Sequence, residues 1–164
     1  MTQDPALRER RDLLVRRHMA DENTLDFDAV LATFPHPRYE IVATGAVYDG
    51  EAAVRAYYAE SRAAFPDQRN EIIALRHADD AVVVEFWLRG THLGPFRAIP
   101  ATGGSFECRM SATFEFQGDT LVCERVYFDV LTLLKQLLRG LDWKQPRSYL
   151  LAARTVRGLL RGLA

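Results

Sequence analysis

The fold is indicated most clearly by residues 105–116, which read SFECRMSATFEF. Hydrophobic side chains occupy every second position of this run, and polar or charged side chains stand between them. Successive side chains of a β-strand point to opposite faces, so the alternation predicts a long strand with one face in the core. We therefore expect one set of side chains to point inward: Phe106, Cys108, Met110, Ala112, Phe114 and Phe116.

The segments on either side extend this strand into a sheet. Residues 71–76, 81–93 and 120–128 are rich in Val, Ile, Phe and Trp and are separated by short polar turns, which predicts an antiparallel meander. A further strand is expected over 38–44. Three- and four-residue spacing of apolar side chains predicts helices over 5–20, 26–34, 51–64 and 130–139, and a last one from about Pro146. Helices that precede a run of strands are typical of an α+β fold with the helices on one sheet face.

Length and composition fit a single globular domain. The chain has 164 residues, 48% of them hydrophobic and 26% charged, and its 21 basic and 22 acidic residues leave a formal net charge of −1. This balance indicates neither nucleic acid nor an acidic partner. The N-terminus has no signal-peptide pattern, and no window approaches the roughly 20 apolar residues that span a bilayer, so we expect a cytoplasmic protein without a membrane partner. Cys108 and Cys123 fall on opposite faces of neighbouring strands, which argues against a disulfide.

Several short motifs in a fixed order carry a resemblance to a known family. They are GTHLG at 90–94, PATG at 100–103, FEFQGD at 114–119, RVYFD at 125–129 and LLKQL at 133–137, with GEAAV at 50–54 and FPD at 65–67. Over about residues 8–139 the chain resembles the SnoaL-like polyketide cyclases of the nuclear-transport-factor-2-like superfamily. The resemblance implies a cone-shaped curved sheet, N-terminal helices that cover a deep pocket, and a homodimer formed through the outer sheet face. It divides the chain into a cone domain, 1–140, and an amphipathic helical extension, 141–164.

The catalytic positions of that superfamily hold other residues here. The family aspartate of the last strand falls at Val126, a cyclase histidine falls at Ala112, and the Arg-x-Asp pair of the related epoxide hydrolase falls at Phe86 and Leu88. The family activity therefore does not transfer residue by residue.

Strand parity then assigns the pocket face. The resemblance turns His92 and its alternate neighbours back to Val84 inward, and on the last strand it turns Val122, Glu124, Val126 and Phe128 inward. His92 and Glu124 would then be the polar groups of an apolar pocket, where burial raises the pKa of a carboxyl toward neutrality. We predict that they act as catalytic acid and base, and that the substrate contacts five side chains: Tyr57, Phe86, Leu88, Met110 and Val126.

Alternatives remain open for these residues. His92 can be a hydrogen-bonded core residue, and Glu124 can belong to an ion pair. Asp129 is a candidate catalytic acid, but it also stands where the helix over 130–139 needs an N-cap. One of the hydroxyls of Tyr57 and Tyr58 can reach a ligand, and Trp87 has outward parity.

The residues predict one of two functions. The chain shows no metal-ligand spacing and no phosphate-binding glycine loop, so we expect no metal and no cofactor. The first function is a cofactor-free cyclase or isomerase that moves protons on a small hydrophobic carbonyl compound, polyketide-like or steroid-like. The second is a non-catalytic small-molecule-binding or dimerisation module of the same fold. The arginine-bearing last helix can dock on the body, cover a dimer edge or lie on an acidic membrane surface.

Overall fold

The computed structural model describes residues 4–96 and 99–162. Along the chain it has α1 (Pro5–Asn23), α2 (Phe27–Leu31), β1 (Arg38–Ile41), the short 3-10 helix η1 (Val42–Thr44), β2 (Ala46–Asp49), α3 (Glu51–Ala64), β3 (Arg69–His77), β4 (Ala81–Thr91), β5 (Ser105–Gln117), β6 (Thr120–Tyr127), α4 (Val130–Arg139) and α5 (Pro146–Gly162). The predicted α+β class and the cone-shaped sheet are confirmed. Among the described residues no helix is both long and apolar enough to cross a membrane.

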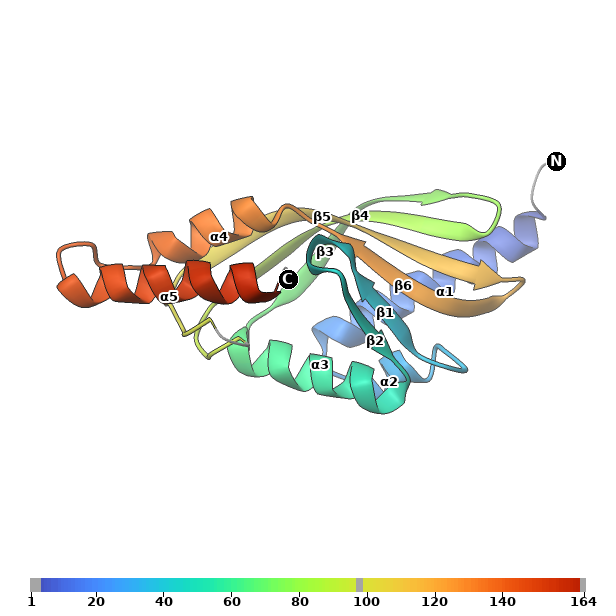
Figure 1. The fold of residues 1–164 in the computed structure, drawn as a ribbon. Coiled ribbons are helices and arrows are strands. Elements are labelled where there is room, and N and C mark those ends of the chain that lie inside the picture. Colours follow the sequence, from blue (N-terminus) through green and yellow to red (C-terminus); the bar gives the residue numbers. More distant parts are fainter. Residues whose placement is uncertain (1–3, 97–98, 163–164) are drawn as a thin grey trace.

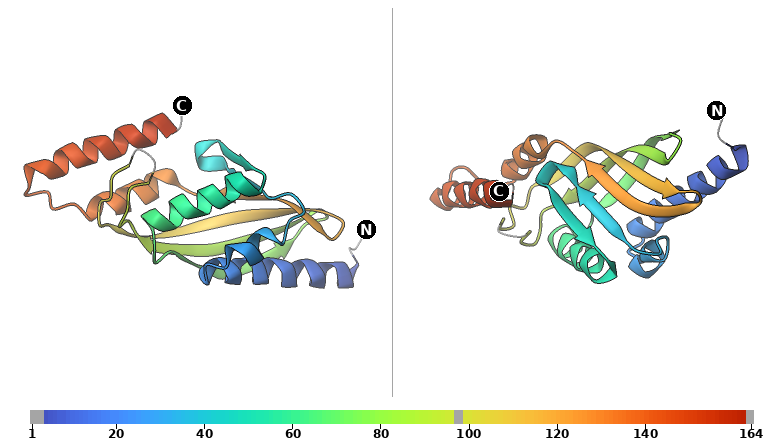
Figure 2. Two further views of the ribbon diagram at one scale, coloured as in Figure 1. Left: turned by 90° about the horizontal axis from the view of Figure 1, so that it is seen from below. Right: turned by 45° about the vertical axis from the view of Figure 1, so that its right-hand side comes forward.

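One curved sheet holds the molecule together. Its strand order is β2-β1-β6-β5-β4-β3, and Figure 1 shows α1, α2 and α3 on its concave side, with α4 and α5 at the end away from the N-terminus. The views in Figure 2 show how strongly the long strands bend around these helices. The sheet is mixed and not purely antiparallel as predicted, because β1 and β6 pair in parallel. These two strands are joined through α3 and the whole β3–β5 meander, a crossover long enough to bring the chain back in the same direction.

The strand expected over 38–44 is a hairpin. The chain leaves β1 after Ile41, turns through η1 and returns as β2, so that Ile41 pairs with Ala46. Gly45 closes the turn with φ of 67°, in the left-handed region that glycine adopts without steric cost. The sequence prediction missed β2 because four residues are too few for a clear alternation.

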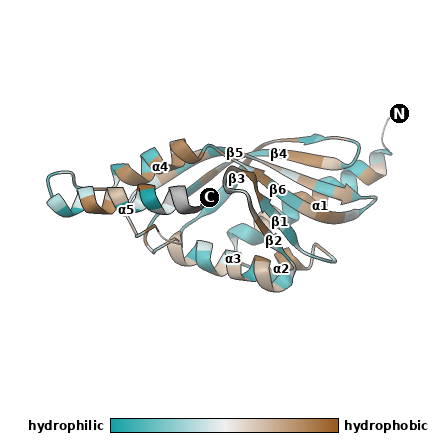
Figure 3. Ribbon diagram, viewed as in Figure 1, coloured by the Kyte–Doolittle hydropathy of each residue, from teal (hydrophilic) through white to brown (hydrophobic). Residues whose placement is uncertain are grey.

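The predicted inward face of β5 is confirmed. Phe106, Cys108, Met110, Ala112, Phe114 and Phe116 are all buried, and Figure 3 shows hydrophobic and hydrophilic segments that alternate along the strands. Each fully buried side chain of Phe or Leu size contributes about 1.5–3 kcal/mol. On β6 the prediction for Val122 is wrong: the register shifts between Glu115 and Phe116, so Leu121 is fully buried there while Val122 is only half-buried. Beyond this bulge Glu124 pairs with Phe114 and recovers the inward parity.

The C-terminal helix α5 has one buried and one exposed side. Ser148 and Thr155 are buried within the single chain, which agrees with docking on the body. Tyr149 and Leu150 are 61% and 60% exposed. A dimer edge or a membrane surface as the partner of this exposed side stays a prediction. Residues 163–164 of the predicted extension lie outside the described residues.

Candidate functional site

A cavity of about 150 Å³ opens between the concave sheet face and the helices. Its wall is mostly apolar and comes from β4, β5, β6, α3 and α4, with the loop after β4 closing one side. The predicted substrate-binding side chains all line it: Tyr57, Phe86, Leu88, Met110 and Val126. Polar side chains line it too, among them Glu22, Ser61, Gln68, His92 and Glu124. The cavity is small for a ligand pocket, which usually measures roughly 300–1,000 Å³.

The end of α1 places an unpredicted carboxylate in this cavity. We predicted a helix over 5–20, but α1 continues to Asn23, because Asn23 bonds Asn70 on β3. The Asn23 amide donates to the Asn70 carbonyl at 2.9 Å, and its oxygen accepts from the Asn70 amide at 2.7 Å. These tertiary bonds hold the last turn of the helix and bring Glu22 to the cavity wall.

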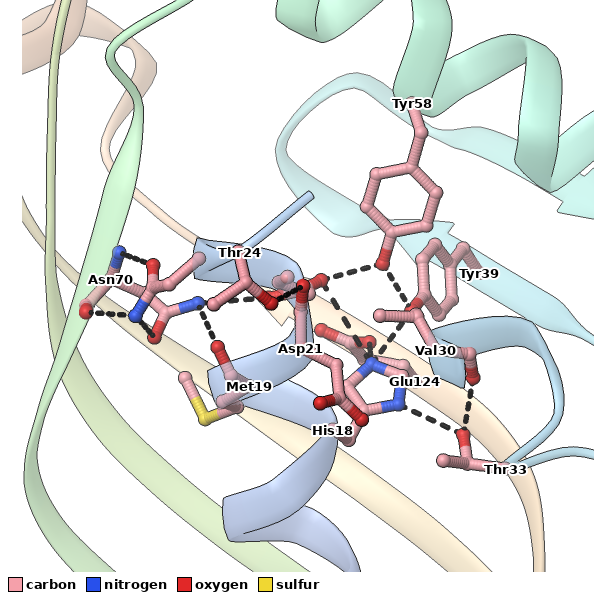
Figure 4. A network of polar contacts seen from close by, with 12 residues as sticks. His18, Met19, Asp21, Thr24, Val30, Thr33, Tyr39, Tyr58, Asn70 and Glu124 are labelled. Atoms are coloured by element: carbon pink, nitrogen blue, oxygen red, sulfur yellow. Dashed lines mark hydrogen bonds and ion pairs between the residues drawn. The ribbon is translucent and has the colours of Figure 1, made fainter. Parts of the chain in front are cut away.

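Glu124 of β6 lies beside His18, a buried histidine of α1 (Figure 4). Its Oε2 is 3.2 Å from Nε2 of His18, a contact with ion-pair distance but without hydrogen-bond geometry. His18 is 0% exposed and Glu124 is 6% exposed. The other ring nitrogen, Nδ1, is 2.9 Å from the Thr33 hydroxyl, which itself donates to the Val30 carbonyl. That hydroxyl oxygen must accept from His18, so Nδ1 carries a proton.

Two tyrosines connect His18 to Glu22. The Tyr39 hydroxyl is 2.8 Å from Nε2 of His18 and 2.5 Å from the Tyr58 hydroxyl, and Tyr58 donates to Oε1 of Glu22 at 2.5 Å. Both hydroxyls are buried. The second oxygen of Glu22 accepts from the Asn70 side chain at 2.9 Å. Four elements, α1, β1, α3 and β6, thus meet in one polar cluster at the end of an apolar cavity (Figure 4).

The charges in this cluster shift two pKa values upward. Burial lowers the pKa of His18. The contact with Glu124 and the negative charges of Glu124, Glu22 and Asp21 together raise it by more, so the net change is a rise. Burial and the charge of Glu124 raise the pKa of Glu22, against smaller opposite effects that include His18 and Arg62. Two carboxylates this close in an apolar site favour retention of a proton. Burial also raises the pKa of Tyr39, Tyr57 and Tyr58, which stay protonated at neutral pH.

The same cluster is where a metal ion could be held. His18, Glu22 and Glu124 each offer one ligand atom, and these atoms lie within 4.8 Å of one another. The sequence pattern did not indicate this grouping, because two of the residues are on α1 and the third is a hundred residues away on β6. The Tyr39 hydroxyl, however, already occupies the Nε2 side of the imidazole at 2.8 Å. A proton fits between these groups without displacing Tyr39.

His92 lies at a different place in the cavity wall. It is fully buried, and its ring stacks on Phe65 with centroids 5.0 Å apart. Nδ1 is 3.2 Å from the Thr102 hydroxyl, while Nε2 is buried without a hydrogen-bond partner among the described residues. Burial lowers the pKa of His92, which makes the imidazole neutral at physiological pH.

The strand register separates His92 from Glu124. Gly90 pairs with Phe106 and Glu124 pairs with Phe114, so the two levels are eight residue steps apart on β5. This is about 26 Å along the strand at the usual rise per residue. Both predicted residues line the cavity, as expected, but their positions do not support proton transfer directly between them.

Asp129 is a helix cap. Its carboxylate accepts from the backbone N–H groups of Leu131 and Thr132 and from the Thr132 hydroxyl, and these bonds hold its pKa below the ordinary value. It is exposed and lines a shallow surface hollow, not the cavity. These three bonds and its place outside the cavity favour the helix-cap interpretation of Asp129, and its role as a catalytic acid stays a prediction.

The sequence contained one overlooked signal for this cluster. His18 and Glu22 are four residues apart on α1, so both lie on the same helix face. Tyr39 and Tyr58 gave no such signal, since aromatic residues at those spacings are typical of any core.

The sequence and the fold of this chain can be compared with those of known proteins. No curated protein matches the sequence. The fold is similar to that of a SnoaL-like polyketide cyclase candidate from Jannaschia sp. CCS1, with 19% identity, a TM-score of 0.74 and coverage of 84% of this chain and 96% of that chain. A polyketide cyclase candidate from Xanthomonas campestris pv. campestris has 18% identity, a TM-score of 0.70 and coverage of 80% and 98%. TsrD from Streptomyces laurentii has 24% identity, a TM-score of 0.67 and coverage of 83% and 98%.

These similarities show the fold, and the family follows from the sequence itself. The family description for SnoaL-like polyketide cyclase matches residues 13–137, which is most of the chain and includes every residue of the polar cluster. Only the first turns of α1 and the region from Leu138 onward, α5 included, lie outside the match. This chain belongs to the SnoaL-like polyketide cyclase family.

Proposed function

We propose that this protein is an enzyme that uses its own side chains for acid–base chemistry on a compact hydrophobic carbonyl compound, and that it cyclises or isomerises that compound. The observation that carries the proposal is the pair of carboxyl groups, Glu22 and Glu124, in the wall of a mostly apolar cavity. Family membership supports the same class of reaction. The cavity volume of about 150 Å³ favours a small polyketide-like ring compound over a four-ring steroid.

The proposed chemistry divides two roles between the carboxyl groups. Glu124, beside His18, is the base: its carboxylate takes a proton from the carbon next to the carbonyl, and the C–H electrons become the enolate π-bond. Glu22, whose pKa is raised by burial and by the charge of Glu124, is the acid: once it carries a proton, it donates to the oxygen or carbon where negative charge develops. In a cyclisation the enolate carbon then bonds to a second carbonyl carbon of the same molecule, and the new alkoxide takes the proton.

His92 has no part in this proposed chemical step. Its buried Nε2 lacks a hydrogen-bond partner among the described residues, but its level lies about 26 Å along β5 from that of Glu124. A compact ring held against Glu22 and Glu124 would not reach it. Tyr57 and the apolar predicted residues would hold the ring.

The competing function is a binding module that has lost catalysis. It is favoured by Val126, which occupies the position of the family aspartate and lines the cavity without an ionisable group. Both functions require the cavity to bind a small apolar molecule, so binding alone does not separate them.

Deuterium exchange separates them. The full chain is incubated in D₂O with 2-tetralone and with cyclohexanone, and loss of the α-proton signals is followed by NMR. We expect the wild type to accelerate exchange, Glu124→Gln to lose at least about tenfold of that acceleration, and the exposed matched control Glu51→Gln to retain it. Ketone binding without accelerated exchange would favour the binding module. Circular dichroism and binding of the same ketone confirm that Glu124→Gln is folded.

The predicted homodimer through the outer sheet face stays a proposal. That face carries ion pairs such as Glu85 with Arg109 around Trp87, whose ring lies within 6.0 Å of the guanidinium carbons of Arg89 and Arg109. Sedimentation equilibrium of the full chain measures the association, and Trp87→Ala should weaken it if this face is the interface.

A further inference from the structure

The polar cluster of α1, β1 and α3 contains more contacts than its tyrosine protons can satisfy. Three short contacts join four side chains in a row, His18 to Tyr39 at 2.8 Å, Tyr39 to Tyr58 at 2.5 Å and Tyr58 to Glu22 at 2.5 Å. The two tyrosine hydroxyls supply two protons, but three contacts at these distances each need one. A third proton must therefore reside at one end of the row.

That proton has two possible positions. When it is on Nε2 of His18, the imidazolium donates to Tyr39, Tyr39 to Tyr58, and Tyr58 to the Glu22 carboxylate. When it is on Glu22, every hydrogen bond runs the opposite way, and Tyr39 donates to the neutral imidazole. Nδ1 stays protonated in both arrangements because it donates to Thr33.

We propose that His18, Tyr39 and Tyr58 form a proton relay that charges Glu22 with a proton when Glu124 has accepted one from the substrate. Conversion between the two arrangements breaks one N–H and two O–H bonds and forms three O–H bonds, so one proton is transferred net from His18 to Glu22. No oxidant, reductant or external base takes part. The use of the relay in turnover rests on the proposed function, whereas the two arrangements themselves do not.

Glu124 decides which arrangement is favoured. As a carboxylate 3.2 Å from Nε2, it stabilises the imidazolium. Once it has been protonated by the substrate, the imidazolium loses this counter-ion in a buried site, and the proton is more stable on Glu22. The base step thus prepares the acid step. The middle of the row is closed to solvent, with His18, Tyr39 and Tyr58 at 0%, 2% and 4% exposure, so the proton has a path through side chains only.

Other charged and polar side chains near the row leave its three hydrogen bonds intact. On α1, Asp21 adds to the negative field at His18, and on α3, Arg62 contributes a positive field at Glu22. Asn70 of β3 donates to the far oxygen of Glu22 and leaves Oε1 to Tyr58. The raised pKa values of both His18 and Glu22 agree with a proton shared between the two ends.

The test uses Glu124→Gln, which imitates protonated Glu124 without any substrate. The protein is labelled with ¹⁵N-histidine, and the His18 ring nitrogens are observed by NMR at neutral pH. A protonated carboxyl group is detected by infrared difference spectroscopy. We expect the wild type to show imidazolium at His18, and Glu124→Gln to show neutral His18 with Nε2 unprotonated. Glu124→Gln should also gain a protonated carboxyl band that the double variant Glu22→Gln, Glu124→Gln lacks.

Several outcomes overturn the relay. One is imidazolium at His18 in Glu124→Gln, and another is neutral His18 without the new carboxyl band, which would mean that the proton went to solvent. A stoichiometric shift of the Nε2 resonance on titration of the wild type with Zn²⁺ would assign these side chains to a metal. If Glu124→Gln does not fold, Glu124→Met removes the same charge and is read in the same way.

A kinetic readout separates the relay from the proposed function. Tyr58→Phe breaks the row, and we expect it to slow ketone exchange at least about tenfold while ketone binding stays within about twofold of wild type. Tyr149→Phe on exposed α5 is the matched control and should change neither. Equal exchange rates in Tyr58→Phe and wild type would overturn the relay. Absence of exchange in the wild type would instead contradict the proposed function, while the spectroscopic result would stand on its own.

Discussion

Raising the pH from 6.5 to 8 should lower the free energy of unfolding of this protein by about 1 kcal/mol. The pKa values of His18 and Glu22 are both raised in the folded chain. The native state therefore binds more protons than the unfolded state above the unfolded pKa of each group, and stability falls as pH rises through this range. The three short contacts among His18, Tyr39, Tyr58 and Glu22 hold one proton beyond those of the two tyrosine hydroxyls. A retained proton corresponds to about 1.4 kcal/mol per pH unit, but the unfolded imidazole is still half protonated at pH 6.5, so the loss up to pH 8 is about 1.5 kcal/mol.

The other described groups with resolved pKa shifts change stability little in this window. Asp49, Asp67 and Asp129 have lowered pKa values, so the stability that they add is complete well below pH 6.5. The pKa of His92 is lowered from 6.5, so its unfolded imidazole, still half protonated at pH 6.5, adds about 0.5 kcal/mol of stability as the pH rises to 8 and offsets part of the decline. The thiols have an ordinary value of 9.0 and begin to contribute only above about pH 8. The tyrosines and arginines with raised pKa values titrate above this window, and Glu40 has a lowered pKa like the aspartates, so His18 and Glu22 account for most of the expected change.

The assay is urea unfolding followed by circular dichroism at several pH values, together with proton release measured by an indicator dye in weakly buffered solution at pH 7.5. We expect stability to decline and about one proton to be released on unfolding. The double variant His18→Gln, Glu22→Gln should lose the slope, and His36→Gln, whose ring is exposed beside Asp49, should keep it. Constant or rising stability of the wild type from pH 6.5 to 8 without proton release would refute the reasoning.

Three further predictions concern packing and the thiols. Gly104→Ala should destabilise the protein by about 1–3 kcal/mol, because an added Cβ would lie 2.4 Å from the Leu137 carbonyl oxygen. Thermal unfolding measures this with Ser105→Ala as the control variant, and an unchanged midpoint in Gly104→Ala would contradict the close approach. Phe114 is fully buried on β5, between β4 and β6, so Phe114→Ala should lower the free energy of unfolding by about 3–5 kcal/mol. Urea unfolding measures this, and a loss as small as that of a surface substitution would show that the site is not packed as described. Cys108 and Cys123 should be inert to a thiol reagent at pH 8 in the folded protein and react in urea, since burial raises their pKa to about 11; rapid labelling of native protein would refute this.

The sequence predicted most elements of the fold, though not β2 or the parallel pairing of β1 with β6. The alternation of residues 105–116 is a local property that burial of one sheet face demands, and the helical spacing of residues 51–64 and 130–139 is equally local. Asp129 follows the same logic, because an aspartate before an apolar helical pattern satisfies free N–H groups wherever the helix is placed. Strand parity, with the inward face taken from the family resemblance, also turned His92 and Glu124 toward the cavity. The slip at Val122 came from a bulge, which adds one residue to a strand and leaves no clear mark in the pattern.

The chemistry of the site was decided only by the tertiary structure. Glu22 reaches the cavity because Asn23 and Asn70, 47 residues apart, hold the last turn of α1. His18 meets Glu124 because the β1–β6 pairing and the position of α1 bring residues a hundred positions apart to 3.2 Å. Such contacts depend on distances across the core, whereas a sequence pattern records only which face a side chain takes. The sequence by itself therefore determined an apolar pocket with His92 and Glu124 in its wall. The packing of α1, β1 and α3 determined that Glu124 is joined by His18, Tyr39, Tyr58 and Glu22, while His92 stands apart.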